Sequence, residues 1–238
     1  MMTGALPVFD LLETIRWTPP DRFFLLDRHL RRLQRSAAYF HYECSEAGIR
    51  RQLDRAVAGS AGPQRVRLLV SSDGTARIEC TPLGPKAARP ATLGIAATPI
   101  DPADVFLFHK TTHRGMYTDR AQPECDDVIL WTAGGDVTET TIANLVVEID
   151  GRKITPPASA GLLPGTFREE LLERGEIVEG RLTLDDVKTA TRVWMINSVR
   201  EWWAAEIRRP LPYIEKTAAA APSSASTASP TPAKRSQR

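Results

Sequence analysis

The chain has 238 residues, of which 42% are hydrophobic and 25% are charged, as in an ordinary soluble globular protein. This length allows one large domain or two small ones, and the formal net charge of +2 is too small to indicate a nucleic-acid or acidic-membrane partner. No apolar run has the length of a membrane span, and the opening "MMTGALPVFD" has no signal-peptide character, so we expect a cytoplasmic protein.

The cysteines of the chain indicate neither a disulfide framework nor a metal site. Cys44, Cys80 and Cys125 are far apart and form no CxxC or His-flanked pattern. Zinc sites need closely spaced thiolates or imidazoles, so this spacing predicts reduced thiols and no metal site. Reduced thiols are typical of a cytosolic protein.

The first part of the chain is predicted to form two helices followed by a hairpin. Apolar residues recur at helical spacing in residues 27–42, with arginines on the other faces. Ser45 is a suitable N-cap for a second helix, which would end near Gly59. Residues 65–83 are typical of two strands joined at Asp73-Gly74, a dipeptide that favours tight hairpin turns.

After a segment rich in Gly, Pro and Ala, strands dominate the second part. Strands are predicted in residues 92–100, 127–141, 144–157 and 192–198, and helices in residues 167–176 and 184–191. The whole pattern predicts an α+β protein with an N-terminal domain (residues 1–83), a linker (84–92), a C-terminal domain (93–216) and a ligand cleft between the domains. Residues 217–238 are small, polar and rich in proline, which predicts a disordered tail.

Lys110 and one Gly-Pro turn are the first candidates for a functional site. A lysine that follows an apolar run such as "DVFLF" is normally a solvated charge, so Lys110 alone predicts no chemistry. In "GLLPGTFREELLERG", a tight turn leads into a helix whose first N–H groups would suit a phosphate, although ordinary turns look similar. The chain has no GxxxxGK[ST] loop and no GxGxxG after a strand, so Walker-type and Rossmann nucleotide binding are not indicated.

A glutamate and a pair of arginines are further candidates with two open interpretations each. Glu139 would be exposed to solvent at a strand end, or, if buried beside a cationic ring nitrogen, it would be a charge partner. Arg31 and Arg32 follow His29 near the start of a helix. They would form a solvated basic face, or one of them would hold a phosphate in a cleft.

Five motifs occur in a fixed order along the chain. They are "RHLRRL", "HKTTHR", "VTETTIANL", "GLLPGTFREELL" and "MINSVRE". Their order and spacing resemble the class IV, branched-chain-aminotransferase-like enzymes that use pyridoxal 5'-phosphate, and within that family 4-amino-4-deoxychorismate lyase. The resemblance runs from Phe9 to Trp203 and implies a two-domain, D-amino acid aminotransferase-like fold of pyridoxal phosphate type IV.

The resemblance implies roles for the candidate residues. Lys110 would bond covalently to the cofactor, which requires a deprotonated amine, and would act as catalytic base and acid. Glu139 would keep the ring nitrogen of the cofactor protonated, and Arg32 would bind its phosphate. The other implied cofactor-binding residues are Leu163, Gly165, Thr166, Asn197 and Ser198. The residues expected near the substrate, without a firm role, are His29, Arg114 and Tyr117.

Three departures from the family pattern affect the interpretation. The strand hairpin and "GDGVFET" stretch that usually begin the family are missing before "PVFDLLETIR", as in enzymes fused to aminodeoxychorismate synthase. Phe167 stands where a second small hydroxyl residue is common, so one phosphate contact is expected to be lost. Asn197-Ser198 replaces the Gly-Thr of branched-chain aminotransferases, which favours the lyase.

The implied activity is conversion of 4-amino-4-deoxychorismate to 4-aminobenzoate and pyruvate, a step toward folate, by a homodimer. Lys110 and Glu139 would serve a branched-chain or D-amino acid aminotransferase equally well, so that alternative stays open. A non-catalytic subunit that binds an aminodeoxychorismate synthase is a third interpretation. The missing hairpin favours this third interpretation, whereas the presence of Lys110, Glu139 and Arg32 argues against it.

Overall fold

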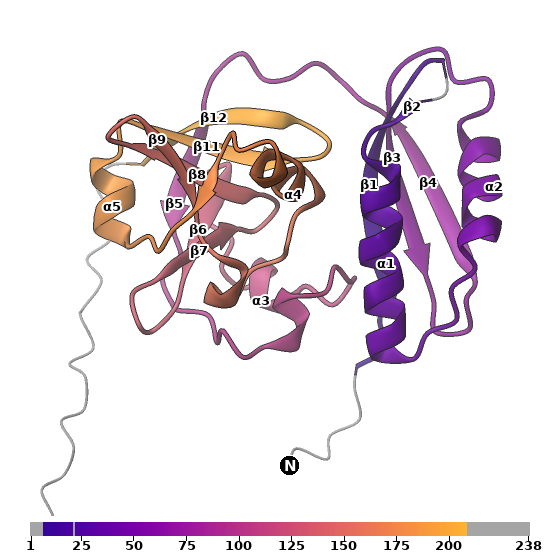
Figure 1. The fold of residues 1–238 in the computed structure, drawn as a ribbon, viewed down its shortest axis with the longest axis horizontal. Helices are drawn as coiled ribbons and strands as arrows, with labels where there is room; N and C mark the ends of the chain where they lie inside the picture. Colours follow the sequence, from indigo (N-terminus) through magenta and orange to yellow (C-terminus); the bar gives the residue numbers. More distant parts are fainter. Residues whose placement is uncertain (1–6, 21, 209–238) are drawn as a thin grey trace, which may run out of the picture.

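Two β-sheets organise the computed structural model, which describes residues 7–20 and 22–208. Figure 1 shows them in two lobes that lie side by side and are joined by an extended segment. One lobe contains a four-stranded sheet and the other an eight-stranded sheet. The connecting residues 83–90 contain no helix or strand.

The N-terminal lobe is a sheet of strand order β2-β1-β3-β4 with two helices packed on it. Its elements are β1 (Leu11–Thr18), β2 (Arg22–Phe23), α1 (Leu26–Phe40), α2 (Glu46–Val57), β3 (Gln64–Val70) and β4 (Ala76–Pro82). Both predicted helices and the predicted β3–β4 hairpin are present. The Ser45 hydroxyl caps α2 by accepting a hydrogen bond from the Gly48 N–H (3.3 Å), as the sequence predicts.

Alternation of side chains gives this sheet two different faces. Ile15 of β1 lies opposite Val66 of β3, and both are buried in a core with Leu30 of α1. The adjacent pair, Thr14 and Arg67, points to the other face because successive side chains of a strand alternate. The face without helices is therefore free to line a site.

The C-terminal lobe is an eight-stranded sheet that closes on itself. Its strands are β5 (Ala91–Ile95), β6 (Asp127–Trp131), β7 (Val137–Thr140), β8 (Asn144–Ile149), β9 (Arg152–Thr155), β10 (Val178–Glu179), β11 (Arg192–Asn197) and β12 (Glu201–Ile207). Its helices are η1 (Val105–Leu107), α3 (Gly115–Thr118), η2 (Ala158–Ala160), α4 (Thr166–Glu173) and α5 (Leu184–Thr189). An additional pairing of β7 with β8 joins the two ends of the run β8-β11-β12-β5-β6-β7, which gives the sheet a barrel-like form.

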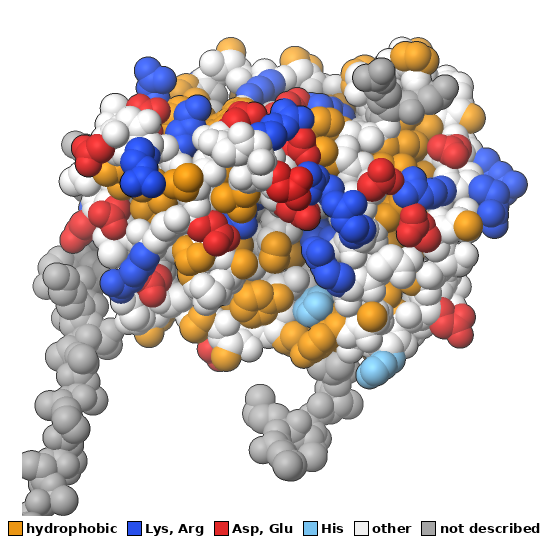
Figure 2. All heavy atoms as spheres, viewed as in Figure 1, with side chains coloured by type: hydrophobic (Ala, Val, Ile, Leu, Met, Phe, Trp, Pro, Cys, Tyr) orange, Lys and Arg blue, Asp and Glu red, His pale blue; other side chains and the backbone are white. Residues whose placement is uncertain are grey.

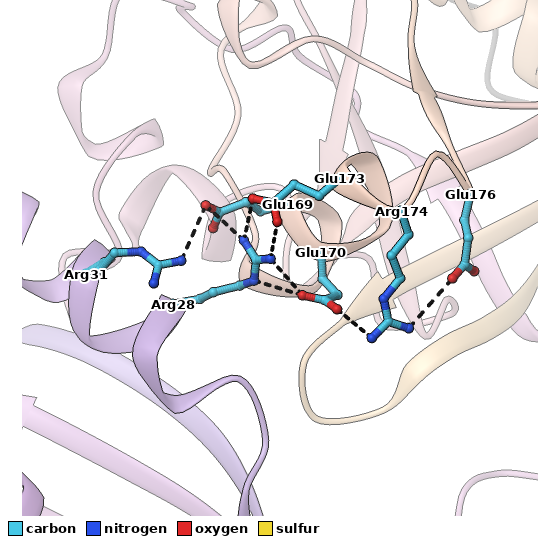
Figure 3. A network of polar contacts seen from close by, with 7 residues as sticks. All are labelled: Arg28, Arg31, Glu169, Glu170, Glu173, Arg174 and Glu176. Atoms are coloured by element: carbon cyan, nitrogen blue, oxygen red, sulfur yellow. Dashed lines mark hydrogen bonds and ion pairs between the residues drawn. The ribbon is translucent and has the colours of Figure 1, made fainter.

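The lobes meet where α1 approaches α4. Figure 2 shows charged side chains of both signs gathered in the middle of the molecule on this face. Figure 3 shows the contact in detail: Arg28 of α1 pairs with Glu169, Glu170 and Glu173 of α4, at distances of 3.1, 2.7 and 2.6 Å. These ion pairs connect the two lobes along α4.

Some sequence predictions differ from the structure or lie outside it. The sequence pattern did not predict strands β1 and β12, and β5 covers only the beginning of the strand predicted in residues 92–100. The predicted tail (217–238) and residues 209–216 of the predicted C-terminal domain lie outside the described residues, so the division into four segments stays a prediction. Within residues 7–20 and 22–208, no helix is long and apolar enough to cross a membrane, and no group of three or more His, Cys, Asp or Glu residues could hold a metal ion.

Candidate functional site

A cavity of about 620 Å³ lies between the two lobes. The sheet face of the N-terminal lobe that carries no helices contributes Leu12, Thr14 and Arg67 to its wall. Ten of the eleven residues singled out by the sequence line the same cavity: Arg32, Lys110, Arg114, Tyr117, Glu139, Leu163, Gly165, Thr166, Asn197 and Ser198. The structure therefore brings together motifs that are separated by up to 166 residues in the sequence (Arg32 to Ser198).

Lys110 is held in the cavity by its backbone. The Lys110 carbonyl accepts a hydrogen bond from the Leu12 N–H of β1 (2.9 Å), and the next residue, Thr111, bridges to Leu11. The preceding turn η1 buries Phe106 and Leu107, which explains why an apolar run leads directly to a lysine. Lys110 is thus an inward-facing residue at the edge of β1 rather than part of a solvated loop.

The amine of Lys110 is electrostatically unusual. Burial lowers its pKa to about 8, and the positive charges of Arg32 and Arg114 contribute to the lowering. An ordinary lysine is almost entirely protonated at neutral pH. A substantial share of Lys110 is therefore neutral under mildly basic conditions, as a nucleophile or a general base requires.

Glu139 is the only acidic residue that lines the cavity among the described residues. It lies on β7, all four residues of which are buried, and its side chain accepts hydrogen bonds from the Tyr117 hydroxyl (3.0 Å), the Leu163 N–H (3.1 Å) and the Asn144 amide (3.2 Å). Burial raises the pKa of Glu139 to about 8 despite the hydrogen bonds from Leu163 and Tyr117. A cationic group brought next to this carboxyl would favour its ionised form.

Arg114 and Tyr117 form the side of the cavity next to Glu139. Arg114 donates a hydrogen bond to the Thr141 carbonyl (2.5 Å), and its guanidinium lies 4.5 Å from the centre of the Tyr117 ring. Burial and the nearby Glu139 raise the pKa of Tyr117 well above its ordinary value. Tyr117 is therefore a neutral hydrogen-bond donor that keeps Glu139 in position.

Arg32 is buried and held by three hydrogen bonds. Its Nε and Nη2 atoms donate to the two carboxylate oxygens of Glu13 (2.8 and 2.6 Å), and Nη1 donates to the Pro164 carbonyl (3.0 Å). Burial alone would raise the pKa of Glu13, but Arg32 and His29 lower it to about 2. The ion pair therefore fixes Arg32 at the turn that precedes α4.

His29 is the one residue of the eleven that does not line the cavity. It is fully buried behind Thr166, with Nδ1 2.7 Å from Glu13 Oε2 and Nε2 3.2 Å from the Thr166 hydroxyl. Burial lowers the pKa of His29, so the imidazole is neutral at physiological pH. In this geometry His29 supports Thr166 and is not a direct neighbour of a substrate.

The turn before α4 leaves no room for a side chain. A Cβ atom on Gly165 would lie 2.1 Å from Asn144 Oδ1, so any other residue would displace that amide. Asn144 also donates a hydrogen bond to the Leu163 carbonyl (2.9 Å), which fixes the turn to β8. The first N–H groups of α4, beginning at Thr166, have no partner within the helix and can donate hydrogen bonds to an anion.

Asn197 ends β11, and Ser198 begins the turn to β12. The Asn197 side-chain oxygen accepts hydrogen bonds from the N–H groups of Val199 (3.0 Å) and Arg200 (2.8 Å). The Ser198 hydroxyl donates a long hydrogen bond to the Thr14 carbonyl of β1 (3.4 Å). Both residues line the cavity; the Asn197 hydrogen bonds shape the turn, and the Ser198 hydrogen bond connects it to β1 of the other lobe.

Sequence reasoning missed several residues that shape the site. Glu13 lies on β1 between the buried residues Leu11 and Ile15, and a carboxylate in such an apolar alternation requires cationic partners. The segment "LLETI" contains this pattern, a carboxylate among alternating apolar residues, but the pattern has meaning only once the segment is recognised as a strand. The missed cavity-lining residues that carry charge are Arg65, Arg67 and Arg200.

Comparison with known proteins identifies the family. The profile of the family "Amino-transferase class IV" matches residues 10–206. A Schizosaccharomyces pombe protein named "Putative aminodeoxychorismate lyase" is 33% identical over 203 residues, which are 81% of this chain and 87% of that protein. The structure of a "Putative amino-acid aminotransferase" from Mesorhizobium loti is 35% identical, with a TM-score of 0.80, over 84% of this chain and 100% of that one. The 4-amino-4-deoxychorismate lyase of Pseudomonas aeruginosa has the same fold, with 20% identity and a TM-score of 0.72 over 83% of this chain and 82% of that one.

The family depends on pyridoxal phosphate, and the cavity contains a suitable partner for each part of that cofactor. Lys110 offers an amine of lowered pKa to an aldehyde, and Glu139 offers a buried carboxyl to a ring nitrogen. The N-terminus of α4, which Gly165 allows to lie close to Asn144, offers free N–H groups to a phosphate. The chain belongs to the class IV aminotransferase family and has the fold of the type IV pyridoxal phosphate enzymes.

Proposed function

We propose that this protein is a pyridoxal phosphate-dependent lyase that converts 4-amino-4-deoxychorismate to 4-aminobenzoate and pyruvate, on the way to folate. The observation that carries the proposal is the 33% identity to a relative named as an aminodeoxychorismate lyase over 87% of that relative. The Asn197-Ser198 pair at the cavity wall supports it, since it adds the bulk and hydrogen-bonding amide of an asparagine side chain where branched-chain aminotransferases have Gly-Thr.

The proposed reaction balances without a co-reactant. A proton leaves the amine-bearing carbon, the C–O bond to the enolpyruvyl group breaks, and the ring becomes aromatic. The departing enolpyruvate takes up a proton and becomes pyruvate. When bound, the cofactor supplies the electron-withdrawing group that makes loss of the first proton feasible.

The residues of this chain would move and hold the protons. Lys110 Nζ, with a pKa of about 8, is suited both to removing a proton and to returning one near neutral pH. Glu139, held by Tyr117, would keep a proton on the ring nitrogen of the bound cofactor. The anion-binding N-terminus of α4 would orient the cofactor through its phosphate.

An amino-acid aminotransferase is the second candidate function. The Mesorhizobium loti structure, described as an amino-acid aminotransferase, is 35% identical to this chain. Lys110 and Glu139 would serve a branched-chain or D-amino acid aminotransferase as well as a lyase. A non-catalytic subunit is a weaker candidate, because Lys110, Glu139 and Arg32 all line one cavity. The homodimer, the aminodeoxychorismate synthase partner and the cytoplasmic location stay predictions.

Product analysis distinguishes these candidates. The purified protein, reconstituted with pyridoxal phosphate, is incubated with aminodeoxychorismate and no keto acid. The lyase should release 4-aminobenzoate and pyruvate in equal amounts. Conversion of the cofactor to pyridoxamine phosphate by leucine, glutamate or D-alanine, with no 4-aminobenzoate formed, would show an aminotransferase. Protein that binds no cofactor would favour the non-catalytic subunit.

A further inference from the structure

The cavity carries more positive charge than the cofactor-binding residues account for. Among the described residues, six basic side chains and one acidic side chain, Glu139, line it. Arg32 is paired with Glu13 (2.6 Å), and Arg67 is paired with Glu79 (3.0 Å). The basic residues of the lining that have no acidic partner at ion-pair distance among the described residues are Arg65, Lys110, Arg114 and Arg200.

Arg65 is an unpaired guanidinium on the sheet face that lines the cavity. The strand register places it opposite Arg16 of β1 and Thr81 of β4. Arg16 is neutralised by Glu201 (2.6 Å), whereas the side chain of Arg65 has no hydrogen bond or ion pair to any described residue. All five N–H groups of Arg65 are therefore available to a ligand.

Arg200 reaches the same cavity from the other lobe. Its backbone N–H is held by the Asn197 side chain (2.8 Å), which fixes the β11–β12 turn. Its Nη1 atom donates to the Gly84 carbonyl (2.7 Å), and no acidic group in the described part of the chain pairs with it. Arg65 of the N-terminal lobe and Arg200 of the C-terminal lobe thus both line the space between the lobes without an acidic partner, in addition to Arg114 beside Glu139.

The wall also contains an apolar surface. Leu83, Ile142 and Trp203 line the cavity, and Ile142 is 52% exposed although it is a large aliphatic residue. Exposed apolar side chains in a concave site are typical of ligand contact. An apolar surface combined with unpaired arginines suits a ring that carries carboxylates.

We propose that the cavity selects amines that carry two carboxylates, and that Arg65 and Arg200 together bind one of these carboxylates. The inference rests on the proposed function, because aminodeoxychorismate has one amine and two carboxylates on a ring scaffold. Guanidinium–carboxylate contacts are charge-assisted and directional, so a substrate with a second carboxylate gains a contact in this basic lining that a substrate with one carboxylate lacks. Because Arg65 is exposed, the affinity for a dianion falls as ionic strength rises.

Binding of two simple probes to the holoenzyme tests the proposal. Isophthalate has two carboxylates on a ring and benzoate has one, and calorimetry measures the affinity of each. Isophthalate should bind about tenfold more tightly or better, as expected for an added charge-assisted pair. Arg65→Gln and Arg200→Gln should each remove most of this preference and raise the KM for aminodeoxychorismate, with little change in kcat. Arg65→Lys and Arg200→Lys, which keep the charge, should retain part of the preference.

Arg51→Gln is the matched control. Arg51 is exposed on α2 and does not line the cavity, so its loss removes the same charge without touching the site. Pyridoxal phosphate content and melting temperature show that each variant is folded. Equal binding of the two probes by the unmodified protein, no binding of isophthalate, or an unchanged preference in both arginine variants would each overturn the inference.

The two proposals fail separately. A protein that prefers isophthalate, loses this preference in the arginine variants and does not turn over aminodeoxychorismate would keep the inference and lose the proposed function. Turnover of aminodeoxychorismate without any preference for isophthalate would keep the proposed function and overturn the inference.

Discussion

Two hydrogen bonds, of 2.8 and 2.6 Å, join the guanidinium of Arg32 to the carboxylate of Glu13, and both side chains are buried. The same carboxylate lies 2.7 Å from His29, whose other ring nitrogen contacts the Thr166 hydroxyl. Arg32 itself reaches the Pro164 carbonyl. Glu13 therefore connects β1 and α1 to the turn that presents the N-terminus of α4, where a phosphate would bind.

Glu13→Gln should weaken both the fold and the cofactor site. Removing one partner of a buried ion pair leaves Arg32 without its countercharge, which costs about 3–5 kcal/mol. We expect a loss of this order in the free energy of unfolding, measured by urea denaturation of the apoprotein. Because His29 and Arg32 both lose their anchor, the Kd for pyridoxal phosphate, measured by its absorbance, should rise about tenfold or more.

The pH dependence of stability provides a second measurement. The pKa of Glu13 is about 2 in the folded protein against an ordinary value of 4.5, so its stabilising effect is fully present above about pH 4.5. It is lost as the pH falls from 4.5 towards 2. In Glu13→Gln, the free energy of unfolding should depend less on pH between 4.5 and 2. Glu79→Gln is the control, since the half-exposed pair of Glu79 and Arg67 should contribute less than about 1 kcal/mol. Equal effects of the two variants would contradict the prediction.

Lys110 should carry the cofactor. Reduction of the holoenzyme with borohydride followed by peptide mass mapping should place the pyridoxyl group on Lys110. Only the neutral amine reacts with an aldehyde, and its pKa is about 8, so the rate of reconstitution of apoprotein should rise with pH and level off above about pH 8. A label on Lys153 or Lys188, or a midpoint near the ordinary lysine value of 10.5, would contradict this assignment.

Glu139→Gln should lower turnover without releasing the cofactor. The amide keeps the shape of the side chain but cannot stabilise a protonated ring nitrogen, so kcat should fall about tenfold or more while the cofactor stays bound. The pKa of Glu139 is raised to about 8, so ionisation destabilises the folded apoprotein as the pH rises from 4.5 through 8. The variant apoprotein should therefore melt at a higher temperature than the unmodified one at pH 8.

Glu148→Gln is the control for this variant. Glu148 lies on the neighbouring strand β8 and does not line the cavity. Its replacement should change neither kcat nor the melting temperature by a measurable amount. An unchanged kcat in Glu139→Gln would remove Glu139 from the mechanism.

Local patterns predicted many of the helices and strands, and most residues that the resemblance singled out line one cavity, although their roles stay predictions. Neither source predicted the buried residues that hold the cavity wall in place. Helix α1 and the β3–β4 hairpin were predictable because helical periodicity and Asp73-Gly74 are encoded in short segments. Strand β1 was not, because its alternation becomes clear only in register with β3. The partners of Glu13 lie 16 and 19 residues away on a helix, so only the packing of α1 on β1 reveals the ion pair. The shared cavity of Arg65 and Arg200 was unpredictable for the same reason, because neither sequence segment indicates how the two lobes pack against each other.

The ion pairs between α1 and α4 give the last prediction. The side chain of Arg28 is 12% exposed and contacts three glutamates of α4 (Figure 3). Arg28→Gln should lower the free energy of unfolding by about 1 kcal/mol in urea denaturation at low salt, because Arg28 and Glu170 are largely shielded from solvent whereas Glu173 is exposed. Arg31→Gln is the matched control on the same helix: Arg31 is 56% exposed and 3.9 Å from Glu169, so its loss should cost less than about 0.5 kcal/mol. Raising the salt concentration to about 1 M should shrink the difference between the variants only in part, since buried pairs are screened less than exposed ones. Equal stability of Arg28→Gln and Arg31→Gln would contradict a specific contribution of the Arg28 ion pairs to the attachment of the lobes.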